Sequence, residues 1–323
     1  MKAALYRRFA SPDVVQVLEA PQPVPKDNEV LIKVRAAAVN PLDWHLGHLF
    51  FGLLAPKGTP AGRDVAGVVE AVGSAVTQFK PGDEVFGVCR GAFAEYACAQ
   101  ETALVAKPAG VTFEQAASAP VAAYTALQGL RDKGRLQSGQ MVLVNGAAGG
   151  VGTFTVQIAR WLGAEVTGVC STRNMQMVRS LGANHVVDYT REDFTQGGQR
   201  YDLIFDLVAN HSLSACARVL NPKGVYIGAG ILALHGSAAR ILGGLLKTLA
   251  LSPFVSQKGI TFTAKSSQQD LTLLGELMAT GKVRPVIDRR YKLSNVPDAI
   301  RYVAEGHARG KVVITPEDSA TAL

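Results

Sequence analysis

The sequence contains few cysteines, and they form no recognisable motif. Cys89, Cys98, Cys170 and Cys216 stand far apart and make no C-x-x-C pair. This spacing excludes a dense disulfide framework, provides no structural zinc site, and favours reduced thiols. The N-terminal residues lack the apolar core of a signal peptide, so we expect a cytoplasmic protein.

Long hydrophobic runs without charge are also missing. The most apolar segment, residues 231–254, is interrupted by His235, Arg240 and Lys247, which argues against a membrane span. The formal net charge of +7 comes from scattered Lys and Arg residues, without runs of five or more. Such scattering favours attraction for an anionic cofactor over a nucleic-acid-binding face, and we expect no nucleic-acid partner.

Short alternating segments with turn signals between them occupy the first third of the chain. The clearest strands are residues 29–39 and 64–72, and a Pro-Gly-Asp turn at 81–83 leads into a strand at 84–86. Segments 93–99 and 102–105 are expected to close the set as a compact, partly open β-barrel. The apolar residues 45–57 between them are interpreted either as a buried loop or as a wall of a substrate pocket.

Beyond Pro108 the hydrophobic period changes to that of an α/β fold. A helix over 113–128, broken at Pro120, precedes strands at 141–145, 165–170, 185–188, 201–207, 224–228 and 259–263. Helices at 173–181, 213–219 and 238–250 alternate with them, which predicts a doubly wound parallel sheet of the Rossmann type. Two helices, 268–280 and 296–305, and strands near Tyr291 and at 310–314 follow. The predicted domains are 1–118, 119–263, and a tail 264–323 that returns to the first domain.

A glycine-rich turn lies between the strand that begins at Met141 and the helix after it. Its residues, Gly146-Ala147-Ala148-Gly149-Gly150-Val151-Gly152, follow G-x-x-G-x-x-G, a variant of the G-x-G-x-x-G dinucleotide fingerprint. Glycines allow the backbone to approach a pyrophosphate, and the first N–H groups of the helix can bind its negative charge. No lysine follows Gly152, which excludes a nucleoside-triphosphate P-loop.

The end of the next strand bears on which nicotinamide cofactor is bound. NAD-binding versions of this fold place an acidic residue there, about twenty residues past the glycines. Here the strand ends in Ser171-Thr172-Arg173, with Glu165 at its beginning. A guanidinium can pair with a 2'-phosphate through its fork of donors and Ser171 can add a hydroxyl bond, so the sequence predicts NADP(H).

Four motifs follow one another along the chain: residues 38–43 (Ala-Val-Asn-Pro-Leu-Asp), 60–67 (Pro-Ala-Gly-Arg-Asp-Val-Ala-Gly), 124–127 (Tyr-Thr-Ala-Leu) and 141–152. Together and in this order, they resemble the zinc-independent quinone oxidoreductase branch of the medium-chain dehydrogenase/reductase superfamily. The resemblance implies a chaperonin-10-like (GroES-like) catalytic domain joined to a Rossmann domain, with NADPH in the cleft between them. It also implies hydride transfer to a quinone or an α,β-unsaturated carbonyl, and a homodimer.

The resemblance assigns roles residue by residue. Asn40 would lie beside the nicotinamide and ribose as the positioning residue of the active site, and Thr125 would also contact the cofactor. The remaining cofactor-binding residues would be Gly149, Gly150 and Val151 at the pyrophosphate, Ser171 and Arg173 at the 2'-phosphate, and Tyr189 near the adenine. This chain departs from the family after the fourth Rossmann strand, where residues 206–210 lack the usual glycine, so the backbone path beside the ribose is less clear.

No metal site is expected. The alcohol dehydrogenases of the superfamily place a cysteine in the turn at 39–43 and a histidine-glutamate pair at 62–64, where this chain has Asn40 and Gly62-Arg63-Asp64. His45 and His48 with Asp43 are a weak alternative, because their loop is apolar. A short-chain reductase is excluded, since none of the eight tyrosines has a lysine four residues later.

Three functional hypotheses follow from these patterns. The first is an NADPH-dependent, metal-independent reductase that positions its cofactor and a small quinone or enone substrate. The second is a nucleotide-bound binding or redox-sensing protein with little turnover, and the third a zinc-type alcohol dehydrogenase. Turnover, NADPH binding and zinc content would separate the three.

Overall fold

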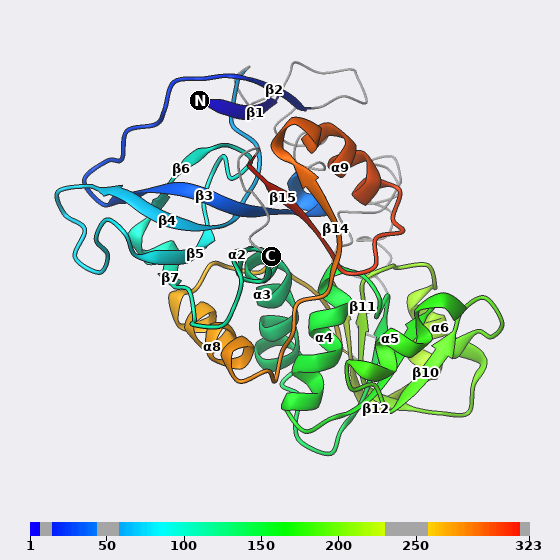
Figure 1. The fold of residues 1–323 in the computed structure, drawn as a ribbon. Coiled ribbons are helices and arrows are strands. Elements are labelled where there is room, and N and C mark those ends of the chain that lie inside the picture. The colour runs from blue at the N-terminus through cyan, green and yellow to red at the C-terminus, as the bar shows by residue number, and fades with distance from the viewer. Residues whose placement is uncertain (7–14, 44–57, 230–257, 317–323) are drawn as a thin grey trace. The chain divides into compact units, whose positions relative to one another are not determined.

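A computed structural model describes residues 1–6, 15–43, 58–229 and 258–316 (Figure 1). Internal contacts divide the chain into two units. The first unit contains Met1–Ala122 and Lys265–Leu323, and the second contains Ala123–Ala264. The two units are described separately below.

The first unit is built on a seven-stranded sheet with the order β14-β15-β3-β4-β5-β7, in which β6 also pairs with β3. All its pairings are antiparallel except that of β14 with β15. A separate hairpin joins β1 (Lys2–Tyr6) to β2 (Val15–Glu19). The sheet strands are β3 (Glu29–Val39), β4 (Asp64–Val72), β5 (Glu84–Val88), β6 (Tyr96–Gln100), β7 (Leu104–Ala106), β14 (Ile287–Lys292) and β15 (Lys311–Thr315).

Helices of the first unit cover parts of this sheet. Helix α2 (Phe113–Ser118) starts with a capping box between Thr112 and Gln115, and contacts β3, β4 and β15. The other helices are α8 (Gln268–Ala279), which lies beside β7, and α9 (Val296–Ala304), which packs near β15 and β2 (Figure 1). Alternating apolar residues of β3 and β4 form one hydrophobic core together with residues of α9 and β15. The C-terminal part of the chain therefore completes the core of the first unit.

The second unit contains a six-stranded sheet in which all pairings are parallel. Its order is β10-β9-β8-β11-β12-β13, the doubly wound arrangement in which the chain reverses direction across the sheet between β8 and β11. The strands are β8 (Met141–Asn145), β9 (Glu165–Cys170), β10 (His185–Asp188), β11 (Tyr201–Asp206), β12 (Leu220–Gly228) and β13 (Lys258–Thr261). The helices are α3 (Pro120–Gln128), which crosses the unit boundary, α4 (Gly150–Trp161), α5 (Met175–Ser180) and α6 (Leu213–Arg218).

The structure corrects two expected strands and one helix. The expected strand 93–99 is β6, which begins three residues later, and the expected strand 102–105 is divided between the 3₁₀ turn η1 (Glu101–Ala103) and β7. The Glu101 carboxylate accepts the N–H groups of Thr77 and Gln78, a tertiary contact that the local pattern does not contain. The expected helix 173–181 begins as the 3₁₀ turn η3 (Thr172–Asn174), because the Thr172 hydroxyl is bound to Asp188 of the neighbouring strand.

Three segments of interest in the sequence lie outside the described residues. They are the loop 45–57, the apolar stretch 231–254 and the helix expected at 238–250. Among the described helices, none is both long and apolar enough to cross a membrane.

Candidate active site

The glycine-rich turn joins β8 to α4 at the carboxyl edge of the parallel sheet. Gly149 is the extended residue just before α4, and no side chain caps the helix start. The first N–H groups of a helix, here those of Gly150, Val151 and Gly152, have no carbonyl one turn earlier to bind. A helix of 12 residues therefore presents free donors and the positive end of its dipole, which suits a pyrophosphate.

Two glycines of this turn, Gly146 and Gly152, are required by the backbone geometry, and Gly149 is not. Gly146 adopts a φ of +88°, in the region that L side chains rarely occupy. A Cβ on Gly152 would lie 2.1 Å from the Gly146 carbonyl oxygen, so only glycine allows this close approach. A Cβ on Gly149 would lie 3.5 Å from the same oxygen, an ordinary contact. Packing therefore does not require a glycine at position 149.

A buried hydrogen-bond network ties together the two strands beside the turn. Asn145 and Asp206 end β8 and β11 and face each other in register. Asn145 Nδ2 donates to Asp206 Oδ1 over 2.9 Å and to Asn210 Oδ1 over 2.9 Å. The Tyr226 hydroxyl donates to Asp206 Oδ2 over 2.8 Å. Because these donors lie at the carboxyl edge of the sheet, they fix the loop 207–210 next to the glycine turn.

In the loop after β11, where the family usually has a glycine, this chain has an alanine in the left-handed backbone conformation. Ala209 has a φ of +56°, the left-handed region in which a side chain is strained. The Asp206 carboxylate accepts the N–H groups of both Val208 and Ala209 over 2.9 Å. These bonds hold the left-handed turn in place, so the backbone path that the sequence left unclear is a tight turn stabilised by Asp206.

The residues expected near the 2'-phosphate follow β9. Ser171 is half-buried and accepts a hydrogen bond from Asn174 Nδ2 over 3.1 Å. Arg173 is exposed, and no described residue pairs with its guanidinium. Tyr189, just after β10, exposes 57% of its surface, which leaves its ring free to stack on a base. Thr125 lies half-buried on α3 of the same unit.

Asp188, a carboxylate that was not predicted from the sequence as part of the site, lies beside these residues. Asp188 ends β10 in register with Cys170, so it stands at the same sheet edge as Ser171. Its oxygens accept the hydroxyls of Thr172 over 2.5 Å and Thr190 over 2.7 Å, and these bonds lower its pKa. Because its oxygens already accept the two threonine hydroxyls, Asp188 is not a free carboxylate of the kind that binds ribose hydroxyls.

In the first unit, strand register brings Asn40, Asp64 and Lys311 together. Asn40 directly follows β3, Asp64 begins β4 opposite Ala38, and Lys311 begins β15 one residue before Val312, which pairs with Val39. Lys311 Nζ lies 2.6 Å from Asn40 Oδ1 and 3.3 Å from Asp64 Oδ2. Asn40 Nδ2 donates to Asp64 Oδ2 over 2.9 Å. All three residues are buried, with exposed fractions of 3% for Asn40, 0% for Asp64 and 3% for Lys311. We call these three residues the buried triad.

Asp43 lies next to the triad, and burial changes its acidity. Its Oδ2 accepts the Asn40 backbone N–H over 2.8 Å, whereas no described residue binds its buried Oδ1. Burial raises the pKa of Asp43 to about 7, and the charge of Asp64 adds to this rise. Burial also raises the pKa of Asp64, against the opposing effect of Lys311 and Asn40. Burial thus raises the pKa of both carboxyl groups in this cluster, that of Asp43 to about 7.

The positions that the resemblance compares with zinc ligands have chemistry unsuited to a metal. The oxygens of Asn40 and Asp64 are already bound to the Lys311 ammonium, whose positive charge would repel a divalent cation. The described ranges contain no group of three or more His, Cys, Asp or Glu side chains arranged to hold a metal ion. His45 and His48 lie outside those ranges.

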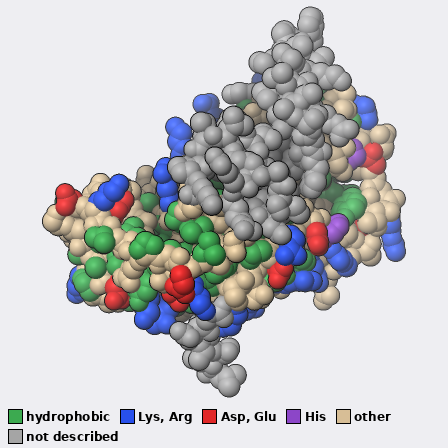
Figure 2. Space-filling view, turned by 90° about the horizontal axis from the view of Figure 1, so that it is seen from above, with side chains coloured by type: hydrophobic (Ala, Val, Ile, Leu, Met, Phe, Trp, Pro, Cys, Tyr) green, Lys and Arg blue, Asp and Glu red, His purple; other side chains and the backbone are tan. Residues whose placement is uncertain are grey.

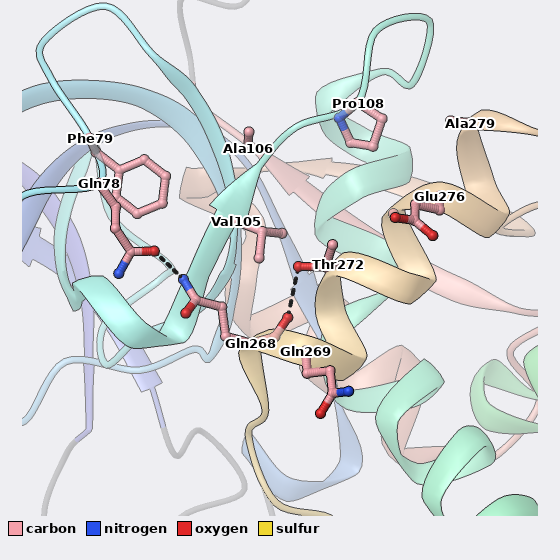
Figure 3. Close-up of a pocket in the computed structure, with 11 residues that line it drawn as sticks. Gln78, Phe79, Val105, Ala106, Pro108, Gln268, Gln269, Thr272, Glu276 and Ala279 are labelled. Atoms are coloured by element: carbon pink, nitrogen blue, oxygen red, sulfur yellow. Dashed lines mark hydrogen bonds between the residues drawn. The ribbon is translucent and has the colours of Figure 1, made fainter.

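Two surface features of the described part add little to the site. On the face seen in Figure 2, Lys and Arg side chains are scattered among Asp and Glu side chains. A cavity of about 630 Å³ lies between β7 and α8 of the first unit, with Val105, Phe79 and Pro108 on one side and Gln268, Thr272 and Glu276 on the other (Figure 3). Gln268 donates to Gln78 across it, and none of the predicted site residues lines it.

The structure gathers most of the expected site residues in the second unit, and Asn40 in the first. Sequence reasoning missed Lys311, Asp206 and Asn145 as parts of the site. Each had a signal: Lys311 is a lone charge at the start of an apolar strand, and Asn145 and Asp206 are polar residues that end two buried strands. Polar residues at the carboxyl ends of neighbouring parallel strands point to a ligand site.

Comparison with known proteins gives relatives that match nearly the whole chain. Residues 26–109 match the "Alcohol dehydrogenase GroES-like domain" family and residues 181–314 match the "Zinc-binding dehydrogenase" family. The chain is 35% identical to 2-methylene-furan-3-one reductase of Solanum lycopersicum, covering 98% of this chain and 79% of the relative. It is also 35% identical to the chloroplastic NADPH-dependent alkenal/one oxidoreductase of Arabidopsis thaliana, covering 98% and 80%.

A solved structure agrees with these relatives. The quinone oxidoreductase from Coxiella burnetii superposes with a TM-score of 0.83 at 29% identity, covering 98% of this chain and 99% of that one. The order of strands in both sheets, the glycine turn before α4 and the sequence identity over nearly the full length lead to the same conclusion. The chain belongs to the quinone oxidoreductase branch of the medium-chain dehydrogenase/reductase superfamily.

Proposed function

We propose that this protein is an NADPH-dependent reductase that transfers a hydride to quinones or to the carbon-carbon double bond of α,β-unsaturated carbonyls. The observation that carries the proposal is the uncapped start of α4 after Gly149, followed by β9 and then by Ser171 and Arg173, whose guanidinium pairs with no residue in the described part of the chain. Two relatives, an NADPH-dependent alkenal/one oxidoreductase and a 2-methylene-furan-3-one reductase, support the same substrate classes.

In this proposal each site residue has a defined task. Gly149, Gly150 and Val151 bind the pyrophosphate through the helix start, Ser171 and Arg173 bind the 2'-phosphate, and Tyr189 stacks near the adenine. Thr125 contacts the cofactor from α3, and Asn40 orients the nicotinamide and ribose. Bound NADPH supplies the hydride for the electrophilic carbon of the substrate.

The chain contributes positioning rather than a metal or a strong acid. Hydride addition to the β-carbon of an enone moves an electron pair onto the carbonyl oxygen, and a proton from solvent then completes the product. We propose that the enzyme works without zinc, because the Lys311 ammonium already occupies the oxygens of Asn40 and Asp64.

NADPH oxidation at 340 nm with a panel of quinones and enones tests this function. Saturable turnover that survives a chelator, with no stoichiometric zinc by elemental analysis, is the expected result. Tight NADPH binding without turnover of any substrate would favour the binding or redox-sensing protein. Activity that is lost to a chelator and restored by zinc would favour the alcohol dehydrogenase.

Replacing Arg173 tests the cofactor assignment. Arg173→Ala should weaken NADPH binding by about 1 to 3 kcal/mol and leave NADH binding nearly unchanged, because only NADPH carries the 2'-phosphate. Fluorescence titration with both cofactors measures the difference. Arg200→Ala, which removes a guanidinium bonded to the Leu220 carbonyl, is a matched control. Equal losses for NADPH and NADH in Arg173→Ala would contradict the phosphate assignment.

We further propose that the protein is a cytoplasmic homodimer. The four cysteines are unpaired, which suits a reducing compartment, and dimers are common in the branch that the sequence resembles. Sedimentation would measure the oligomeric state, and a monomer at micromolar concentration would contradict the dimer.

A further inference from the structure

The buried triad fixes which end of the Asn40 amide faces which neighbour. Its oxygen lies 2.6 Å from the Lys311 ammonium, which can only donate, and its nitrogen lies 2.9 Å from Asp64, whose carboxylate accepts. Turning the amide by 180° would place the NH₂ group against the ammonium and the oxygen against the carboxylate. Both contacts would then be repulsive inside the protein, so the triad permits one orientation only.

The hydrogen bonds from described residues leave the Asn40 amide with one unused position. One N–H bonds to Asp64 and the other points to the Ala38 carbonyl at 3.4 Å. The oxygen accepts from Lys311 with one of its two lone pairs. With 3% of Asn40 exposed, a ligand can reach the amide through little more than that second lone pair.

We propose that Lys311 and Asp64 are positioning residues that hold the Asn40 amide as a hydrogen-bond acceptor toward the cofactor. The inference rests on the proposed function, which gives Asn40 its place beside the nicotinamide. The group that Asn40 meets on NADPH is then a hydrogen-bond donor. Asn40 does not stabilise the negative oxygen of the reduced substrate, because that task needs a free donor.

The arrangement of the strands explains why these two residues can do this. Asp64 has a second anchor, since its Oδ1 accepts the Val121 backbone N–H over 3.0 Å. Lys311 is fixed at the start of a buried strand that pairs with β3. The amide is therefore held between two charges that are themselves attached to the sheet, and its position follows that of the sheet.

Removing both charges together separates positioning from folding. Lys311→Met alone leaves Asp64 buried without its counter-charge, whereas the double variant Lys311→Met/Asp64→Asn removes both charges of the triad and should fold. In the double variant we expect the single-turnover rate of quinone reduction at saturating NADPH to fall about tenfold or more, toward the rate of Asn40→Ala. The midpoint of thermal unfolding should stay close to that of the wild type. A folded double variant that reduces quinone within about twofold of the wild-type rate would overturn the proposal.

A second measurement does not depend on turnover. NMR of protein labelled with ¹⁵N-asparagine, with the Asn40 signal identified by its loss in Asn40→Ala, reports exchange of the side-chain NH₂ protons. We expect slow exchange in the wild type and exchange about tenfold faster in the double variant. Equal exchange rates would overturn the proposal even if quinones are reduced. A wild-type protein that lacks turnover but shows the expected exchange difference would contradict the proposed function and leave the amide orientation supported.

Discussion

Asp64 and Asp206 are both buried aspartates at the end of a strand, but their carboxylates bind different kinds of partner. Asp64, in the first unit, bonds to an ammonium, an amide and a backbone N–H. Asp206, in the second unit, is surrounded by neutral donors: Asn145, the Tyr226 hydroxyl, and the N–H groups of Val208 and Ala209. Their exposed fractions are 0% and 1%, so burial does not separate them.

The difference shows two ways to keep a carboxylate inside a protein. A single counter-charge makes the first cluster depend on one residue, because removing it leaves an uncompensated charge. In the second cluster several neutral donors stabilise the Asp206 carboxylate together, so each single donor contributes less to the free energy of unfolding. The first arrangement orients a side chain, Asn40, and the second shapes a loop next to the glycine turn.

Loss of the counter-charge should have the largest effect. We expect Lys311→Met to lower the free energy of unfolding by about 3 to 5 kcal/mol, because Asp64 is left buried and unpaired. Denaturant unfolding measures this, with Lys311→Met/Asp64→Asn as the control that should recover most of the loss. The loss should be smaller at pH 5 than at pH 8, because a proton on Asp64 can replace the missing cation. A loss below about 1 kcal/mol would contradict the comparison.

The pH dependence of stability should be the next largest effect, and it belongs to the first cluster. The charged groups that act on the Asp43 carboxyl are Asp64, Lys311 and Arg63, and the Tyr6 hydroxyl donates to the Asp43 backbone carbonyl. Because the folded pKa of Asp43 is about 7, above the value of 3.8 for a free side chain, folding takes up a proton between these values. The stabilisation is complete below pH 4 and is lost as the pH rises through 7.

The variant Asp43→Asn isolates this contribution. Between pH 5 and pH 8 the wild type should lose on the order of 2 kcal/mol of stability relative to Asp43→Asn, since each pKa unit corresponds to about 1.4 kcal/mol. Denaturant unfolding of both proteins across this range gives the difference. Parallel pH curves for the two proteins would show that Asp43 does not titrate near neutrality.

Removing one neutral donor from the second cluster should have a smaller effect. Tyr226→Phe keeps the ring and deletes the hydroxyl that bonds to Asp206 Oδ2, so we expect a loss of about 1.5 kcal/mol. Unfolding experiments run beside Lys311→Met make the comparison direct. If Tyr226→Phe lowered the free energy of unfolding as much as Lys311→Met, the inference that several neutral donors stabilise Asp206 together would be wrong.

The smallest effect should be a gain in stability. Ala209 is held at a φ of +56°, which glycine adopts without strain, so Ala209→Gly should raise the free energy of unfolding by about 0.5 to 1 kcal/mol. In Ala217→Gly, within α6, the same substitution should instead cost about 1 kcal/mol. Destabilisation by Ala209→Gly would mean that the alanine methyl group contributes packing that outweighs the strain.

Much of the fold was predicted from local patterns, and the errors have tertiary causes. The bounds of β3, β4, β9 and β10 agree with the expected strands, and the helix 113–128 is interrupted at Pro120 as expected. Strand β2 was not predicted, because residues 15–19 form a strand only by pairing with β1. The turn η1 was mistaken for strand, because the contacts of Glu101 lie more than twenty residues away in the sequence.

The candidate site divides in the same way. By itself, the sequence determined the glycine turn, the strand before it and the arginine after the next strand, because steric permissiveness and helix polarity are properties of neighbouring residues. Only the tertiary structure decided that Lys311 meets Asn40 across 271 positions of the chain, and that Asp206 compensates for the missing glycine. The physical reason is that strand register sets which buried polar groups face each other, and register depends on the pairing of whole strands rather than on any local pattern.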